Sequence, residues 1–529
     1  MDKHFPTWRI MDQLSYTVTL SAMSYDQMTV THPLSVPDEV VQNIHLLFDH
    51  ISYDKGASIL SMLMNTLGED LFFKCIQNYL KTFAYSNANS HDLWFIVKNE
   101  SQIDNIEPMM KAWTHQPGFP LITVQKSNKT GWYNVHQCRF IVTSDEKKRV
   151  KEDDPTVWIV PIVYITASDN KPKLVWLNGK DDYVNLSTKD EWVKINHRFG
   201  YYYRSHYDEE SIVQLSRDLM SNNSILHPMD KLSIISDLMT VARIGRLNIS
   251  TAFFHFEYLK NETDLYVISE FFSHLKYIHR IIRDMDDIKT KFENYSIGFS
   301  RPIIDRLGYD LHSDRQTRLF CFPFRLLQTL AISTNIAFEE KETLDRARTS
   351  FKKIDPDILT TYACGYVKLS TDKEWEQLLQ IFIATSDPIE KEIYRIALSC
   401  SKNVLMLERL LNMSLDPTII PLQDSRDVIL DVSRSPFGAN LAWNFIKQNW
   451  KKIQDQMSDV PHSFSRLVAG AAGRLKTLSD FDDVKACMAR NNIEFLKSGF
   501  EESLESIGNS IYWVSKNVME LRSYLDSYR

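Results

Sequence analysis

The longest uninterrupted pattern in this 529-residue chain is helical, and it covers everything after about residue 208. Apolar residues recur at helical spacing in segments of roughly 10–18 residues, and short polar turns separate the segments. The segments are Ile212–Met220, Lys231–Ile244, Asp264–Phe292, Phe320–Thr334, Trp375–Thr385, Pro388–Ser399 and Leu405–Asn412. They show no fixed repeat length. Paired helices continued without a strand predict an α-superhelical domain of the HEAT or ARM type over residues 208–529.

A different pattern occupies residues 117–207, where short runs of β-branched and aromatic residues replace the helical spacing. Turn sequences such as Asp169–Pro172 and Asn178-Gly179 separate these runs. The runs are Leu121–Val124, Val135–Val142, Val157–Thr166, Lys173–Leu177, Trp192–Asn196 and Tyr201–Arg204. Several short strands at this spacing predict a small β-sandwich domain.

Residues 1–116 are expected to be mostly helical, with helices at about 54–67 and 69–83 and Gly68 ending the first. Tyr53 stands just before three small residues, Gly56, Ala57 and Ser58. Small residues allow another element to approach a helix closely. Tyr53 is therefore either a tyrosine that fills space in the core or a hydroxyl held in a site, and the local pattern leaves both interpretations open.

Charge and motif content exclude several classes of protein. The net charge is −7, and the 61 basic residues are dispersed among 68 acidic ones, so no nucleic-acid-binding surface is indicated. No run of about 18 apolar residues predicts a transmembrane helix, and Met1–Ile10 lacks the apolar core of a signal peptide. The sequence has no His-Glu-x-x-His, no Gly-x-Ser-x-Gly and no phosphate-binding loop. The motifs thus predict no complete active site.

Cysteines and glycosylation sequences point to the compartment. Six cysteines are too few for a disulfide-built scaffold. Asn-x-Ser/Thr sequences are frequent, however, and favour a secretory compartment. The glycosylation candidates are Asn128, Asn185, Asn222, Asn248 and Asn261.

Six separated segments, in chain order, carry a family resemblance. They are Thr31-His32-Pro33-Leu34, Phe48–Ala57, Met110-x-x-Trp113-x-x-Gln116-x-Gly118-x-Pro120, Trp158–Ile162, Tyr202–Asp208 and Ala442–Trp450. Together they resemble the zinc aminopeptidases of the M1 family, the aminopeptidase N-like gluzincins. The resemblance implies a multidomain, mainly α fold with a small β-sandwich. Residues 1–116 would be the C-terminal helical part of the thermolysin-like catalytic domain, residues 117–207 the sandwich, and residues 208–529 the helical C-terminal domain.

The resemblance also implies roles for individual residues. In the family, the tyrosine at the position of Tyr53 donates its hydroxyl to the oxyanion of the tetrahedral intermediate while N-terminal residues are removed from peptides. Family spacing implies a disulfide between Cys364 and Cys400, which requires an oxidising compartment. The family therefore implies an extracellular or cell-surface location.

Two family segments are missing from these 529 residues: the zinc-binding His-Glu-x-x-His helix and the Gly-x-Met-Glu-Asn segment that holds the substrate's amino terminus. We therefore expect no cofactor in this chain, although the full-length family binds Zn²⁺, and we expect this chain to be catalytically inactive. The alternative is a pseudoenzyme that serves as a peptide-binding or dimerisation module, with a peptide or a second copy of the chain as its partner.

Overall fold

The computed structural model describes residues 2–36, 48–146, 154–186, 192–221, 224–309, 322–350, 356–435, 437–458, 461–491 and 493–528. The chain packs as two compact units. Unit 1 contains residues 1–247 and 251–258, and unit 2 contains residues 248–250 and 259–529. The predicted three-part division at residues 116/117 and 207/208 stays a prediction.

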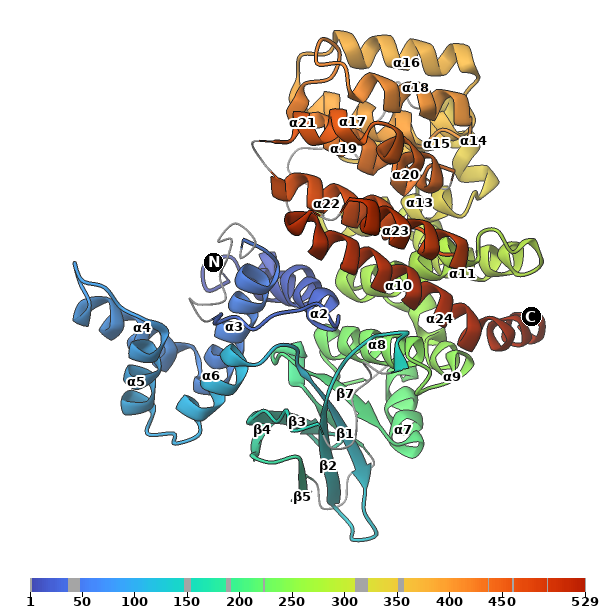
Figure 1. The fold of residues 1–529 in the computed structure, drawn as a ribbon. Coiled ribbons are helices and arrows are strands. Elements are labelled where there is room, and N and C mark those ends of the chain that lie inside the picture. Colours follow the sequence, from blue (N-terminus) through green and yellow to red (C-terminus); the bar gives the residue numbers. More distant parts are fainter. Residues whose placement is uncertain are drawn as a thin grey trace. The chain divides into compact units, whose positions relative to one another are not determined.

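Unit 1 begins with helices, as predicted (Figure 1). They are α1 Ile10–Leu14, α2 Leu20–Asp26, α3 Gly56–Leu67, α4 Glu69–Thr82, α5 Ser90–Ser101 and α6 Ile106–His115. Gly68 separates α3 from α4 with φ +82°, a left-handed conformation that glycine adopts without strain. Helix α3 starts later than expected because residues 51–55 form a wider π-turn. A second π-turn, Ser15–Thr19, joins α1 to α2.

The seven strands that the structure describes in unit 1 form two sheets. The first has the order β5-β2-β1-β7, with β1 and β7 parallel, and the second has the order β4-β3-β6. Their bounds are β1 Pro120–Lys126, β2 Trp132–Arg139, β3 Val160–Thr166, β4 Asp169–Leu177, β5 Asp181–Asn185, β6 Val193–Ile195 and β7 Arg204–Tyr207. The Ile195 N–H of β6 donates to the Tyr207 hydroxyl of β7 at 3.0 Å, and this hydrogen bond links the two sheets. The small two-sheet sandwich is confirmed.

The sequence pattern missed strand β5 and placed the strand at β7 too early, over residues 201–204 instead of Arg204–Tyr207. The β5 residues Asp181, Asp182, Tyr183 and Asn185 are exposed, because β5 lies at the edge of the first sheet and pairs only with β2. Two adjacent aspartates suggest a solvated face rather than a strand. Charged residues at an edge strand oppose unwanted pairing with other chains, which explains their presence here.

Two helices of the predicted helical region belong to unit 1, namely α7 Glu209–Met220 and α8 Pro228–Arg243 (Figure 1). Helix α8 packs on β7 through a buried ion pair, in which Arg204 Nη1 lies 3.0 Å from Asp237 Oδ1. Helix α9, Ile249–Phe254, is divided between the units, because residues 248–250 belong to unit 2 and residues 251–258 to unit 1.

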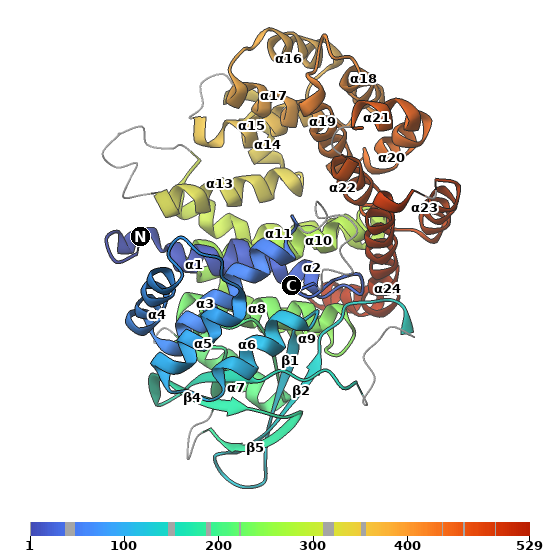
Figure 2. The same ribbon diagram turned by 60° about the vertical axis from the view of Figure 1, so that its left-hand side comes forward.

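Unit 2 is helical throughout its described residues, in agreement with the predicted fold class (Figure 2). The 31-residue helix α24 packs against α10, α11, α22 and α23. The helices are α10 Leu265–Ile282, α11 Asp286–Leu307, α13 Phe322–Ala337, α14 Lys341–Ser350, α15 Pro356–Lys368, α16 Asp372–Ala384, α17 Pro388–Ser399, α18 Val404–Ser414, α19 Leu422–Arg434, α20 Ala439–Gln448, α21 Trp450–Gln456, α22 Pro461–Ala472, α23 Leu478–Arg490 and α24 Lys497–Ser527.

The segment predicted as one helix over 264–292 is two helices, so that prediction is wrong. Helix α10 ends at Ile282, and α11 starts at Asp286 after Met285, whose φ of −110° and ψ of 82° are not helical. Asp286 and Asp287 occupy the first turn of α11, where carboxylates stabilise the helix dipole. Apolar spacing that continues across the break hides it in the sequence.

In the described part of the chain, no helix combines the length and apolar character needed to span a bilayer.

Candidate functional site

Tyr53 lies in the π-turn Ile51–Lys55 and points its side chain toward solvent. The Lys55 N–H donates to the His50 carbonyl, five residues earlier, at 3.0 Å. This wider turn interrupts α-helical spacing and is frequent at functional sites. The Tyr53 side chain is 60% exposed, and its ring centroid lies 6.2 Å from that of Phe48. Tyr53 is therefore an accessible hydroxyl and does not fill the core.

Asp49 and His32 hold the start of this turn. Asp49 Oδ1 accepts hydrogen bonds from the Ile51 and Ser52 N–H groups at 3.0 and 2.9 Å. Asp49 Oδ2 lies 2.7 Å from His32 Nε2, and His32 Nδ1 lies 2.8 Å from the Pro33 carbonyl oxygen. Both ring nitrogens face acceptors, so the arrangement favours the imidazolium. Burial opposes this charge, but the Asp49 and Pro33 hydrogen bonds outweigh burial and raise the pKa of His32.

The His32–Asp49 pair should make stability depend on pH in a defined window. Burial raises the pKa of Asp49, but the hydrogen bonds from His32 and Ser52 lower it by more. The pKa of Asp49 therefore lies below its ordinary value of 3.8. The contribution of Asp49 to the free energy of unfolding is thus complete above pH 3.8. It is lost as the pH falls through the folded-state pKa of Asp49. The contribution of His32 to the free energy of unfolding is complete below pH 6.5. It is lost as the pH rises through the folded-state pKa of His32, which is higher. Both contributions coexist between these limits.

The first test is an NMR titration of ¹³C-labelled histidine, in which the His32 midpoint should lie above 6.5. Asp49→Asn should lower that midpoint, because burial is then opposed mainly by the Pro33 hydrogen bond and no longer by the Asp49 carboxylate. Asp54→Asn is the matched control, since Asp54 pairs with His50 at 2.7 Å and not with His32. An unchanged His32 midpoint in Asp49→Asn would contradict the pairing.

A buried ion pair anchors the other end of the turn. Lys55 Nζ lies 2.9 Å from Asp26 Oδ2, and both side chains are completely buried. Burial lowers the pKa of Lys55, and the charge of Asp26 opposes that change. Lys55 also donates to the Gly118 carbonyl at 3.0 Å, and the Tyr202 hydroxyl donates to Asp26 at 3.3 Å. The residue two positions after Tyr53 is thus fixed from several sides.

Gly118 completes this anchor with its backbone alone. Its N–H donates to Asp26 Oδ1 at 2.9 Å, while its carbonyl accepts from Lys55. Its φ is +83°, and an added Cβ would lie 2.7 Å from Arg139 Nε. Only glycine fits both conditions. Helix α2, the π-turn, the start of β1 and Tyr202 therefore meet at one buried polar centre within unit 1.

Ser21, His50 and Asp54 have the residue types of a nucleophilic triad but not its geometry. His50 Nδ1 lies 2.7 Å from Asp54 Oδ2 and 3.2 Å from Ser21 Oγ. Both contacts use the same ring nitrogen, so the imidazole cannot take a proton from one side while the carboxylate orients the other. The ring instead stacks on Tyr25 at 4.1 Å. These residues support the surface of the turn beside Tyr53.

The remaining predicted site residues lie outside the Tyr53 region. Cys364 of α15 and Cys400, which follows α17, form a disulfide in unit 2 with a Cα–Cα distance of 5.3 Å. Asn222 falls outside the described residues. The side chains of the other four glycosylation candidates are exposed: Asn128, Asn185, Asn248 and Asn261.

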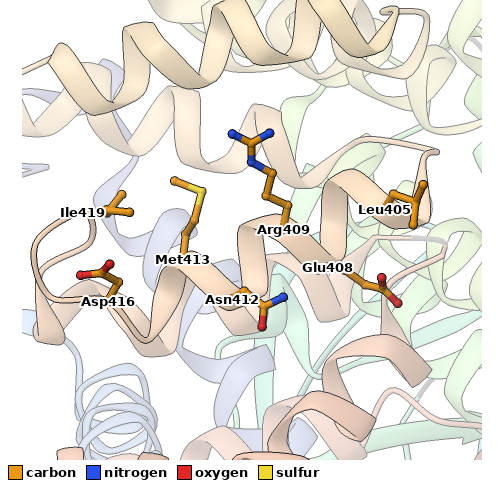
Figure 3. Close-up of a pocket in the computed structure, with 7 residues that line it drawn as sticks. All are labelled: Leu405, Glu408, Arg409, Asn412, Met413, Asp416 and Ile419. Atoms are coloured by element: carbon orange, nitrogen blue, oxygen red, sulfur yellow. The ribbon is translucent and has the colours of Figure 1, made fainter.

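Unit 2 also carries a surface pocket of about 420 Å³ along α18 and the turn after it (Figure 3). Arg409, one of its charged residues, is engaged in an ion pair with Glu376. The lining residues are Leu405, Glu408, Arg409, Asn412, Met413, Asp416 and Ile419. They include no nucleophile paired with a base, so the pocket has no catalytic arrangement.

The described residues offer no cluster of zinc ligands. Within the ranges that the structure describes, no three His, Cys, Asp or Glu side chains gather closely enough to hold a metal ion. His136 is engaged with Asp181 at 2.7 Å, and His197 lies 3.3 Å from Asp230, so each of these rings faces a carboxylate.

Comparison with known families decides the assignment. The ERAP1-like C-terminal domain family matches residues 192–509, and the peptidase family M1 domain matches residues 1–113. The chain belongs to the M1 peptidase family. The resemblance deduced from the six sequence segments is confirmed.

Relatives extend the match along the whole chain. Aminopeptidase N of Bos taurus is 29% identical over 97% of this chain and 55% of its own length. Endoplasmic reticulum aminopeptidase 2 of Bos taurus is 26% identical over 98% of this chain and 58% of its own length. Aminopeptidase Ey of Gallus gallus is 28% identical over 98% of this chain and 55% of its own length. The chain thus spans just over half the length of these relatives.

Two of the M1 motif segments, Met110–Pro120 and Trp158–Ile162, contact each other within unit 1. Trp113 Nε1 donates to the Ile159 carbonyl at 3.0 Å, and Gln116 Nε2 donates to the Val157 carbonyl at 3.0 Å. Sequence reasoning identified these segments but missed the role of Asp26 and Lys55. The sequence offered one signal for this pair. Lys55 directly precedes the small residues at the start of α3, a position that is expected to be buried and apolar.

Proposed function

We propose that residues 1–529 act as the Tyr53-bearing and C-terminal helical portion of an M1-type aminopeptidase. The observation that carries the proposal is the exposed Tyr53 hydroxyl on a turn anchored by a buried ion pair. In the M1 reaction class, an N-terminal residue is removed from a peptide. The Tyr53 hydroxyl would donate a hydrogen bond to the oxygen that becomes negative as the scissile carbonyl turns tetrahedral.

The turn is suited to this role because a donor must be positioned before charge develops. The His32–Asp49 pair fixes the start of the turn, and the Lys55–Asp26 pair fixes its end. A hydroxyl held on such a turn needs little rearrangement at the moment of reaction, which is the source of its effect. Tyr53 alone supplies neither a nucleophile nor a base, so residues 1–529 on their own should not hydrolyse peptides.

The test is an assay of purified residues 1–529 with leucine and alanine p-nitroanilides, with and without added Zn²⁺. We expect no release of p-nitroaniline above that of Tyr53→Phe, and no stoichiometric zinc by elemental analysis. One zinc per chain together with release of product would contradict the proposal. Intact mass and N-terminal sequencing of the natural protein then determine where the natural chain begins.

The second candidate is a peptide-binding or dimerisation module without hydrolysis. It is favoured by the poor fit of the described residues to zinc, combined with the retained, exposed Tyr53. Natural protein that consists of residues 1–529 and binds peptides without cleaving them would support this function. Natural protein that carries a zinc-binding helix and releases amino acids would support the first.

The cysteine pair and the exposed sequons support a proposal about location. A disulfide between Cys364 and Cys400 persists only in an oxidising compartment. We propose that the protein works in the secretory pathway or outside the cell, with glycans at the exposed asparagines. Glycosidase treatment that leaves the mass of the natural protein unchanged would argue against it.

A further inference from the structure

Cationic side chains gather where three helices of unit 2 end. Helix α10 ends at Ile282, α19 at Arg434 and α22 at Ala472. The cations are Arg280, Arg283, Arg434, Arg474 and Lys476. Cations near helix C-termini are common, because the last carbonyl groups carry partial negative charge.

Two of the five cations bind such carbonyl groups, and a third pairs with a carboxylate. Lys476 Nζ donates to the Arg280 and Ile281 carbonyls, both at 3.0 Å, and so caps α10. Arg280 donates to the Arg474 carbonyl at 3.2 Å, just beyond the end of α22. Arg434 pairs with Asp431 at 2.7 Å in the last turn of α19. Each of these side chains has a structural role.

Arg474 is different, because its guanidinium makes no ion pair or hydrogen bond within the described parts of the chain. It is partly buried. Burial, and then the charges of Arg280, Arg434 and Arg283, lower its pKa to about 10, with no carboxylate acting in the opposite direction. A cation held among like charges is destabilising unless an anion joins it.

The nearby carboxylates are already engaged by other cations. Asp284 pairs with Lys476 at 2.8 Å and lies 3.5 Å from Arg283 Nε. Asp431 pairs with Arg434 and with Arg395, the latter at 2.5 Å. The cluster therefore keeps an excess of positive charge, and Arg474 belongs to it without a carboxylate partner of its own among the described residues.

We propose that Arg474, with Arg280 and Arg283, binds a phosphate-type dianion. Planar guanidinium groups bind phosphate oxygens through paired hydrogen bonds, and a dianion offsets several positive charges at once. The source is inorganic phosphate or the phosphate group of a small ester. This site is independent of Tyr53 and of peptide hydrolysis.

A ligand site and a structural arginine predict opposite effects of removing the charge. If Arg474 serves packing, Arg474→Gln lowers the melting temperature in every buffer. If it serves an absent anion, Arg474→Gln relieves repulsion and raises the melting temperature in phosphate-free buffer. The phosphate-dependent rise seen in the wild type should then disappear.

The experiment is calorimetric titration and thermal unfolding of the full 529-residue chain. Sodium phosphate is compared with sodium chloride at equal ionic strength and pH. We expect phosphate-specific binding that weakens by about 10–100-fold in Arg474→Gln, as expected for loss of hydrogen bonds to a charged group. A parallel titration with glycerol phosphate distinguishes a phosphate ester from the free ion, because the natural class of ligand should bind more tightly than the other.

Arg348→Gln is the matched control, because Arg348 lies in the same unit and pairs with Glu374 at 3.5 Å, away from the cluster. It should bind phosphate as the wild type does. Equal weakening in both variants, or no phosphate-specific binding by the wild type, would overturn the site. If Arg474→Gln does not fold, Arg474→Lys keeps the charge but loses the paired geometry, and should still weaken binding.

Discussion

Replacing Asp26 with alanine is expected to lower the free energy of unfolding of unit 1 by about 3–5 kcal/mol. The substitution leaves the Lys55 ammonium buried without its carboxylate, in a place that water does not reach. It also removes the acceptor of the Gly118 N–H and of the Thr31 hydroxyl, which lies 2.7 Å from Asp26. An uncompensated buried charge is among the most destabilising changes a single substitution makes.

Hydrogen exchange of the α2 and α3 amides measures this loss in unit 1 separately from unit 2. The double variant Asp26→Asn/Lys55→Met removes both charges and should lose less stability than the sum of the single variants. Asp104→Ala is the control, because Asp104 is exposed in a turn and should change stability by less than about 0.5 kcal/mol. Additive losses in the double variant would show that the two charges do not act as a pair.

Removing the disulfide should destabilise unit 2 nearly as much. The Cys364–Cys400 bridge closes a loop with a sequence separation of 36 residues. The chain-entropy model assigns such a loop about 3–4 kcal/mol, because the bridge restricts the unfolded chain. The variant Cys364→Ala/Cys400→Ala should show this loss in hydrogen exchange of α15 and α17, while unit 1 stays unchanged.

Cys138→Ala provides the comparison for the disulfide variant, since Cys138 is a free, partly exposed cysteine of unit 1. It should leave unit 2 stability unaltered. Mild reduction of the wild type with dithiothreitol should reproduce the loss in unit 2. A double variant within about 1 kcal/mol of the wild type would mean that the helical packing, and not the covalent bond, holds α15 to α17.

Local patterns predicted much of this fold because they reflect local physics. Gly68 marked the end of α3, Pro388 marked the start of α17, and β-branched runs marked β1 and β3. The sequence did not predict strand β5, because edge strands tolerate the charges that otherwise indicate a loop. It did not predict the break between α10 and α11, because apolar spacing continues across that break.

The site shows a sharper limit of local reasoning. Tyr53 attracted attention through the small residues after it and through family resemblance, and its exposure then excluded a core role. Asp26 carried no signal, because its meaning depends on Lys55, Gly118 and Tyr202, which are brought together only by tertiary folding. A buried pair between distant residues leaves no periodicity that a single sequence displays.

The parallel pairing of β1 with β7 also affects how the protein is made. Residues 121–124 align with residues 204–207, and Tyr202 reaches Asp26 across a separation of 176 residues. A ribosome adds roughly 5–20 residues per second. Helix α2 therefore emerges roughly 9–35 s before the segment that covers Asp26. During that interval the nascent helices cannot complete their polar centre, so this stretch of the growing chain is where a chaperone would be needed most.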